Sequence, residues 1–256
     1  MTMPREIELV ADAHHLADAV AHRFVSAANA AVQARGEFIV ALSGGSTPRP
    51  AYARLATEPF VSMVDWSRIH FLWCDERCVP TYHEQSNFRM VRETLLDHVN
   101  VRDENVHRIQ GEDDPAQAAA NYERVLRALL RTPVGPPQIT QASRLDLVLL
   151  GLGSDGHTAS LFPHATSLKA DGEWVATSYV QSASMWRVTL TTALINAASQ
   201  IAFVVSGEEK AVIVREVLEG PNRQDSLPAQ LIVPVDGRVA WLLDAKAAAK
   251  LRQVRT

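Results

Sequence analysis

The sequence has little of what marks several specialised protein classes. Among its 256 residues only Cys74 and Cys78 are cysteines, too few for a disulfide framework in a chain of this size. Lysine and arginine (25) do not outnumber aspartate and glutamate (29), and the net charge of −4 argues against general nucleic-acid binding. No apolar run reaches the ~18 residues of a membrane span, and MTMPREIELV lacks the apolar core of a signal peptide. We therefore expect a soluble, cytoplasmic protein that binds neither nucleic acid nor membrane.

A zinc site is the main metal alternative, and the sequence supports it weakly. Cys74 and Cys78 flank the segment 75–77, and His70 or His83 would give a crude ligand set. The spacing is poor for zinc, and there is no second cysteine pair. We expect no bound metal.

Apolar strands alternate with amphipathic helices along the chain. The predicted strands are 38–42, 69–74, 145–150, 201–205 and 239–243, with two more near 174–180 and 186–190. The predicted helices are 14–35, 48–57, 87–98, 115–131, 208–218 and 244–252, and 75–86 is predicted to be a polar loop. This pattern favours an α/β fold with a mostly parallel open sheet covered by helices on both faces, plus a small antiparallel addition at 174–190. The Pro- and Gly-rich segment 132–137 is predicted to be a surface loop, so 1–256 is expected to form a single domain.

A glycine-rich turn, Gly151-Leu152-Gly153-Ser154-Asp155-Gly156-His157, follows the apolar strand at 145–150. The carboxyl ends of the strands are where open α/β sheets bind ligands. His157 is a candidate general base, and Asp155 could orient the imidazole or raise its basicity. Gly153 would let the backbone approach a substrate closely.

A second small-residue loop, Ser43-Gly44-Gly45-Ser46-Thr47, lies between the strand at 38–42 and the helix predicted to begin at Pro48. Its backbone N–H groups and hydroxyls suit an anion such as phosphate, although a tight turn with a Ser/Thr cap explains the sequence equally well. The loop lacks the lysine of a nucleotide-binding P-loop, so ATP and GTP are not expected.

Charged side chains at other predicted strand ends complete the candidate site. Asp75 and Arg77 follow the strand at 69–74, Arg187 opens the strand at 186–190, and Lys210 begins the helix at 208–218. Arginine matches carboxylate, phosphate or oxyanion geometry, and a lysine at a helix start can meet a bound phosphate. Taken singly, each charge could equally be an ordinary solvated surface group.

The 151–157 turn partly matches two known sequence motifs but does not have all the features of either. Gly151-x-Gly153-x-x-Gly156 has the spacing of a dinucleotide-binding fingerprint, but Pro163 makes the long helix of that unit doubtful, and no clear strand ends in the acid that should follow. Ser154 would need a glycine two residues earlier to form a serine-hydrolase elbow, and that position is Leu152. Neither NAD binding nor a Ser–His–Asp esterase is expected.

Taken together, the motifs resemble those of 6-phosphogluconolactonases over nearly the whole chain, from about 6 to 250. The matching segments, in order, are SGGSTP (43–48), DERCVPTYHEQSN (75–87), GLGSDGHTASLFP (151–163), RVTLT (187–191) and GEEKA (207–211). The resemblance implies the sugar-phosphate isomerase type of Rossmann-like fold and a carboxylic ester hydrolase without metal or organic cofactor. The implied reaction is hydrolysis of 6-phospho-D-glucono-1,5-lactone to 6-phosphogluconate, the second step of the oxidative pentose phosphate pathway. The expected partner is thus a small sugar-phosphate lactone, bound by a monomer or small homo-oligomer.

On this hypothesis His157 activates water and Arg77 stabilises the oxyanion, while the 43–47 loop, Arg187 and Lys210 hold the phosphate. A glucosamine-6-phosphate deaminase or isomerase is the closest alternative. That family carries a turn like DGHIAFNEP, and Phe162 stands where its ring-opening glutamate would be. A sugar-phosphate sensor without activity is a second alternative, because fold alone does not fix function.

Overall fold

The computed structural model describes residues 5–131, 144–170 and 172–252. The predicted loop at 132–137 lies outside these ranges. The strands are β1 (Glu6–Val10), β2 (Phe38–Leu42), β3 (Ile69–Trp73), β4 (Asp75–Arg77), β5 (Val106–His107), β6 (Leu147–Leu150), β7 (Val175–Val180), β8 (Met185–Leu190), β9 (Gln200–Val205) and β10 (Arg238–Asp244). The α-helices are α1 (Ala13–Arg35), α2 (Arg49–Leu55), α3 (Asn87–Thr94), α4 (Pro115–Leu129), α5 (Thr192–Asn196) and α6 (Ala211–Glu219). The 3₁₀ helices are η1 (Val61–Met63), η2 (Trp66–Arg68), η3 (Leu96–His98), η4 (Asp103–Asn105), η5 (Thr166–Lys169), η6 (Gln181–Ala183), η7 (Glu208–Lys210) and η8 (Pro228–Leu231).

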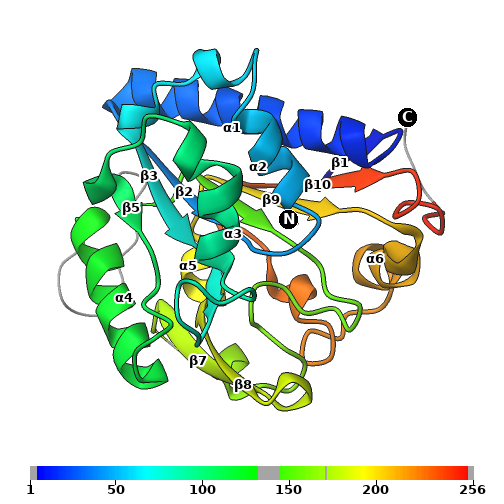
Figure 1. Ribbon diagram of the computed structural model, residues 1–256. Coiled ribbons are helices and arrows are strands. Elements are labelled where there is room, and N and C mark those ends of the chain that lie inside the picture. Colours follow the sequence, from blue (N-terminus) through cyan, green and yellow to red (C-terminus); the bar gives the residue numbers. More distant parts are fainter. Residues whose placement is uncertain (1–4, 132–143, 171, 253–256) are drawn as a thin grey trace.

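Seven parallel strands form the main sheet in the order β1-β10-β9-β6-β2-β3-β5. Helices α1, α2 and α3 pack against one another in turn along this sheet, and α4 packs against the small antiparallel sheet β4-β8-β7 (Figure 1). The predicted fold, a mostly parallel sheet with helices and a small antiparallel addition, is confirmed. Because the strands of the main sheet are parallel, the loops that follow β2, β3, β6 and β9 all emerge at the same edge.

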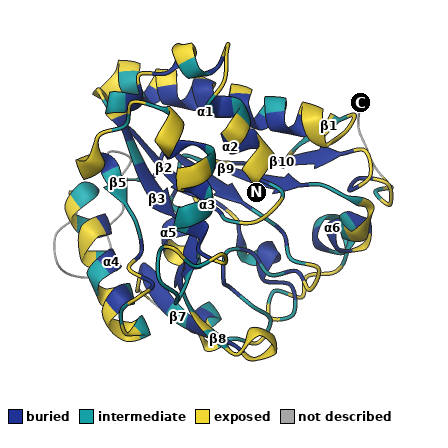
Figure 2. Ribbon diagram, viewed as in Figure 1, coloured by how far each residue is buried: buried dark blue, intermediate teal, exposed yellow. Residues whose placement is uncertain are grey.

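Burial explains why the predicted elements form where they do. Every residue of the apolar strands β2 and β6 is buried, as central strands covered on both faces require. Figure 2 shows β2 in the dark blue of buried residues. Helix α1 turns Leu16, Val20 and Phe24 toward the sheet and begins where Asp12 accepts hydrogen bonds from two backbone N–H groups. It ends at Gly36, whose φ of 82° suits a residue without a Cβ.

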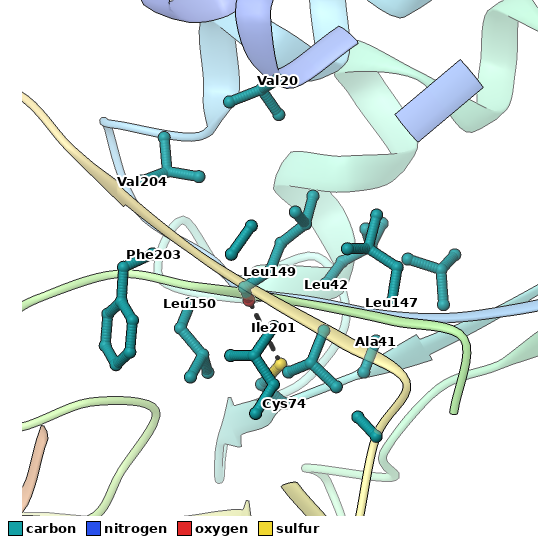
Figure 3. Close-up of a cluster of buried hydrophobic side chains, with 14 of the residues drawn as sticks. Val20, Ala41, Leu42, Cys74, Leu147, Leu149, Leu150, Ile201, Phe203 and Val204 are labelled. Atoms are coloured by element: carbon teal, nitrogen blue, oxygen red, sulfur yellow. Dashed lines mark hydrogen bonds between the residues drawn. The ribbon is translucent and has the colours of Figure 1, made fainter. Parts of the chain in front are cut away.

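The core continues to the edge where the loops emerge. In Figure 3 the aliphatic side chains of β2, β6 and β9 surround Cys74, which is fully buried. The Cys74 thiol donates to the carbonyl oxygen of Leu149 at 3.4 Å. Ser43 Oγ donates to the same oxygen at 2.7 Å, so three neighbouring strands are tied together at this carbonyl.

The sequence prediction missed three strands. Residues 75–77 were expected in a polar loop, but they form β4 and pair with β8. Their burial depends on hydrogen bonds from residues distant in sequence, which no local pattern shows. Strand β1 alternates glutamate with apolar residues at the edge of the sheet, where Arg23 binds Glu6 and Glu8, and β5 is only two residues long.

The predicted helix at 244–252 is also wrong, because 245–250 form successive turns. The carboxylate of Asp244 accepts from the backbone N–H of Ala247 at 2.7 Å. The N–H groups of Ala249 and Leu251 then bond to carbonyls three residues back, so no α-helix continues. High helix propensity of the Ala- and Lys-rich sequence is overridden by these local contacts.

Four other predicted helices are shorter than expected, and the one over 115–131 ends at Leu129. The helix predicted over 48–57 is limited to α2, and the one over 87–98 ends with α3 and is followed by the separate turn η3. The helix over 208–218 begins as the 3₁₀ turn η7 before α6. Lys210 therefore lies just before the α-helix rather than inside it.

Candidate active site

One cleft of about 220 Å³ brings the sequence-predicted residues together at the carboxyl edge of the sheet. Its lining residues are Ser43, Gly44, Gly45, Ser46, Thr47, Pro48, Asp75, Arg77, Asn87, Gly151, Leu152, Gly153, His157, Ala159, Arg187 and Lys210. A larger hollow of about 1040 Å³ lies between α4 and β7, but none of the predicted residues lines it. The chemistry-bearing groups identify the smaller cleft as the candidate active site.

The turn after β6 presents His157 to the cleft. His157 Nδ1 lies 2.6 Å from Asp155 Oδ1, and the backbone N–H of His157 donates to the same oxygen at 3.1 Å. A Cβ added at Gly153 would lie 2.0 Å from His157 Nδ1, so only glycine lets the ring pack so closely against the backbone. The imidazole is partly buried, with 28% of its side chain exposed.

In the Asp155–His157 hydrogen bond, the imidazole is the donor and the carboxylate is the acceptor. Burial alone would raise the pKa of Asp155, but the hydrogen bonds and charge of His157 outweigh it and bring this pKa below its usual value. An ionised carboxylate only accepts, so it selects the tautomer with the proton on Nδ1. Nε2 of His157 is then left with a free lone pair, as a general base requires.

Arg77 reaches the cleft from β4. Its Nη1 donates to the carbonyl oxygen of Gln85 at 2.6 Å. The buried carboxylate of Glu76 accepts from the backbone N–H groups of Arg77, Asn87 and Phe88 at 2.7–2.8 Å. Burial raises the pKa of Glu76, and these hydrogen bonds oppose that shift. The start of α3 and the strand β4, which carries Arg77, are thus fixed to one another by a single carboxylate.

Asp75 is more a buried support than an exposed catalytic acid. Only 5% of the residue is exposed, and its Oδ2 accepts from Ser160 Oγ at 2.5 Å. Asn87 Nδ2 donates to the backbone oxygen and to Oδ1 of Asp75 at 2.9 and 3.2 Å. Sequence reasoning missed Asn87 and Ser160 as parts of the site. Both lie inside the recognised motifs, but neither residue type marks a site by itself.

Arg187 lies beside Arg77, because the two residues are opposite one another in the β4–β8 pairing. Its Nη1 is 3.8 Å from Asp75 Oδ2, and its guanidinium carbon is 5.6 Å from the centre of the Phe162 ring. The other neighbour of that ring is His157, with 4.3 Å between the ring centres. Burial lowers the pKa of Arg187; the charge of Asp75 opposes this shift and the charge of Arg77 adds to it.

The loop after β2 forms the other wall of the cleft. Ser43 is buried, and its hydroxyl donates inward to Leu149, so its side chain has a structural hydrogen bond. Ser46 and Thr47 are exposed and partly exposed, and Gly45 has a φ of 104°. A Cβ at Gly44 would lie 1.7 Å from Asn87 Oδ1. The loop therefore offers backbone N–H groups and two hydroxyls to the cleft.

Lys210 approaches the cleft from the turn after β9. Gly207 in this turn has a φ of 101°, and the carboxylate of Asp244 accepts from its N–H and from Ser206 Oγ at 3.2 and 2.5 Å. Strand β10 thus anchors the turn that carries Lys210. Three cationic side chains, Lys210, Arg77 and Arg187, face one small cleft, which suits an anionic ligand even though the whole chain is net negative.

The cysteines do not build a metal site. Cys74 lies in the core, and burial raises the pKa of Cys78 to about 11, so its thiol stays protonated at neutral pH. In the described ranges, no cluster of three or more His, Cys, Asp or Glu side chains could hold a metal ion. Of the helices within these ranges, none is long and apolar enough to cross a membrane.

Comparison with known proteins shows the family of this chain. The family model described as glucosamine-6-phosphate isomerases/6-phosphogluconolactonase matches residues 11–241. The chain belongs to this family. It is 36% identical over 239 residues to the 6-phosphogluconolactonase of Haemophilus influenzae, covering 93% of this chain and 96% of that protein.

Solved structures extend the similarity to the fold. The 6-phosphogluconolactonase of Trypanosoma brucei superposes with a TM-score of 0.83 at 28% identity, covering 98% of this chain and all of the other. A monomeric glucosamine-6-phosphate deaminase superposes with a TM-score of 0.78 at 20% identity, covering 96% of this chain and 100% of the deaminase, which shows the shared fold alone. Both chemistries named in the family thus occur on this fold, and the residues of the cleft must decide between them.

Proposed function

We propose that this protein hydrolyses 6-phospho-D-glucono-1,5-lactone to 6-phospho-D-gluconate, the second step of the oxidative pentose phosphate pathway. The observation that carries the proposal is the Asp155–His157 pair in a cleft that also holds three cationic side chains. Ester hydrolysis needs a base, an anion stabiliser and a water molecule, and the cleft supplies the first two.

His157 Nε2 takes a proton from a water molecule whose oxygen attacks the C1 carbonyl. The carbonyl electron pair moves to its oxygen, and Arg77 stabilises the resulting oxyanion. Collapse of the tetrahedral intermediate breaks the bond between C1 and the ring oxygen, which receives the proton from His157. Asp155, ionised and bonded to Nδ1, stabilises the imidazolium formed between these two steps.

The phosphate is proposed to lie between the 43–47 loop and Lys210. The loop contributes backbone N–H groups with the hydroxyls of Ser46 and Thr47, and Lys210 contributes a positive charge. Binding energy from this non-reacting end would hold the lactone carbonyl in place for attack.

Phe162 argues against deaminase chemistry in this cleft. Moving a sugar between aldose and ketose forms requires protons to pass between the ring oxygen, C1 and C2, which the deaminase-type glutamate assists. Here an aromatic ring, 4.3 Å from the imidazole, lies where that acid would be. A ring cannot shuttle protons, whereas hydrolysis does not need a second acid there.

The decisive experiment measures lactone hydrolysis by the purified protein against the spontaneous background. We expect a rate well above background with 6-phosphogluconolactone and no ammonia from glucosamine 6-phosphate. Addition of EDTA should leave the rate unchanged. Ammonia release would establish the deaminase alternative, and ligand binding without turnover of either substrate would establish the sensor.

The active form is proposed to be a single-domain cytoplasmic monomer or small homo-oligomer, with a small sugar-phosphate lactone as its partner and neither nucleic acid nor membrane. Both cysteines are free, which fits a reducing compartment. Light scattering on the purified protein tests the oligomeric state, and fractionation of cells tests the cytoplasmic localisation.

A further inference from the structure

Arg187 was expected from sequence at the phosphate, but its neighbours lie at the reacting end of the cleft. In the antiparallel pair β4–β8, Arg77 and Arg187 are directly opposite one another. Side chains in such a position project from the same face of the sheet, a few ångströms apart. Arg187 therefore lies beside Arg77, the side chain proposed to stabilise the oxyanion.

The imidazole of His157 and the guanidinium of Arg187 are neighbours of the same aromatic ring. The ring of Phe162 has His157 as one neighbour, with 4.3 Å between ring centres, and the guanidinium of Arg187 as another, 5.6 Å from the ring centre. Base and cation are thus separated by one aromatic ring. Because His157 and Arg187 also line the same small cleft, both groups can approach a carbonyl that is bound there.

The hydrogen-bonding capacity of Arg187 is unused within the described residues. Its side chain is only 15% exposed, yet its Nε has no partner, and the nearest carboxylate oxygen, on Asp75, is 3.8 Å away. The carboxylate of Asp75 already accepts from Ser160 and Asn87. Two arginines opposite one another, with the carboxylate nearest to Arg187 already accepting from other donors, favour an additional anion beside them.

We infer that Arg187 acts with Arg77 on the C1 oxygen of the substrate, as a second oxyanion stabiliser and then as a ligand of the product carboxylate. This inference rests on the proposed lactonase function and leaves the phosphate to Lys210 and the 43–47 loop. When water adds to C1, the carbonyl electron pair moves to the C1 oxygen, and the two guanidiniums stabilise the negative charge that forms there. After the bond to the ring oxygen breaks and the acid ionises, the product carboxylate carries that charge in the same place.

The kinetic test compares two lactones in two variants. With Arg187→Gln we expect kcat to fall about 10²-fold on 6-phosphogluconolactone, as for loss of one oxyanion donor, and equally on unphosphorylated gluconolactone. Lys210→Gln is the matched control, and it should raise KM for the phosphorylated lactone alone. Arg187→Lys keeps the charge but loses the planar fork, so it should recover only part of the lost rate. A loss confined to the phosphorylated lactone in Arg187→Gln would make Arg187 a phosphate anchor and overturn the inference.

A binding test separates this inference from the proposed function. 6-Phosphogluconate and D-glucitol 6-phosphate differ in the carboxylate at C1 and share the phosphate. Arg187→Gln should weaken binding of 6-phosphogluconate about tenfold or more, the scale of a charge-assisted hydrogen bond, and leave D-glucitol 6-phosphate unaffected. Retained binding of the alcohol also shows that the variant is folded.

Equal weakening of both ligands, or of neither, would contradict the assignment of Arg187 to C1. Wild-type protein that binds both ligands but does not hydrolyse the lactone would instead remove the proposed function. The binding comparison would still report which end of the ligand Arg187 contacts.

Discussion

The 43–48 loop after β2 and the 151–157 turn after β6 leave adjacent parallel strands at the same edge of the sheet, and each depends on a glycine. A Cβ at Gly44 would lie 1.7 Å from the buried amide of Asn87, and one at Gly153 would lie 2.0 Å from the imidazole of His157. The first glycine brings a loop of N–H groups and hydroxyls against a fixed support. The second makes room for one reactive ring. Damage to the first region should therefore weaken substrate binding, and damage to the second should slow the reaction.

The sharpest test of this contrast is His157→Ala. We expect kcat to fall by about 10²-fold or more, the scale for losing a general base, while 6-phosphogluconate still binds. Steady-state kinetics and calorimetry measure the two quantities. Near-wild-type turnover would remove His157 from the mechanism.

Gly153→Ala should reproduce much of that loss without changing a reactive group. The new Cβ overlaps the imidazole and must push it away from Asp155, so we expect kcat to fall about 10- to 100-fold. Adding His157→Ala should cause little further loss, because both changes act through one ring. Gly44→Ala is the matched control: its Cβ meets Asn87, and KM should rise more than kcat falls. Equal kinetic effects of the two glycine variants would break the contrast between the two turns.

Lys210→Gln tests the recognition side. A charge-assisted hydrogen bond contributes roughly 1.5–3 kcal/mol, so kcat/KM for 6-phosphogluconolactone should fall by about one to two orders of magnitude. Hydrolysis of unphosphorylated gluconolactone should not change, and the discrimination between the two lactones should shrink. A similar loss on both lactones would place Lys210 outside phosphate recognition.

Asp155→Asn is expected to have the smallest kinetic effect, a decrease in kcat of about tenfold through loss of imidazole orientation. In the wild type the pKa of Asp155 is held below its usual value by His157 against the effect of burial. Stability from this carboxylate is therefore present above its unfolded pKa of 3.8 and is lost only as pH falls through the lower, folded pKa. Asp155 should accordingly stay ionised as the pH falls from neutral towards its unfolded pKa of 3.8, so its protonation should not appear in the kcat profile over that range. A protonation step that is present in the wild-type kcat profile above pH 3.8 and absent in Asp155→Asn would contradict the lowered pKa of Asp155.

Most of the scaffold could be predicted because its signals are local. Apolar runs predict β2, β6 and β9, and their parallel order brings residues far apart in sequence to one edge. Strand β4 could not be predicted, since Asp75 and Glu76 read as solvent-exposed until their partners from 86–88 and 160 are known.

The candidate residues could be found from motifs, but the role of each residue could not. Sequence reasoning grouped Arg187 with Lys210, because both lie near predicted strand ends. The register of β4 with β8 instead places Arg187 opposite Arg77. Likewise, the inward hydrogen bond of Ser43 and the support given by Asn87 depend on tertiary contacts.

The carbonyl oxygen of Leu149 accepts a hydrogen bond from Ser43, the first residue of the loop after β2. Leu149 itself is two residues before Gly151, the first residue of the turn after β6. The two walls of the cleft thus begin at adjacent, paired strands, and we expect the spacing of β2 and β6 to set the separation between them. Such a cleft should select substrates by the number of carbon atoms between the phosphate and the carbonyl. We expect a phosphorylated lactone that is one carbon shorter to be hydrolysed much more slowly, even though it has every functional group.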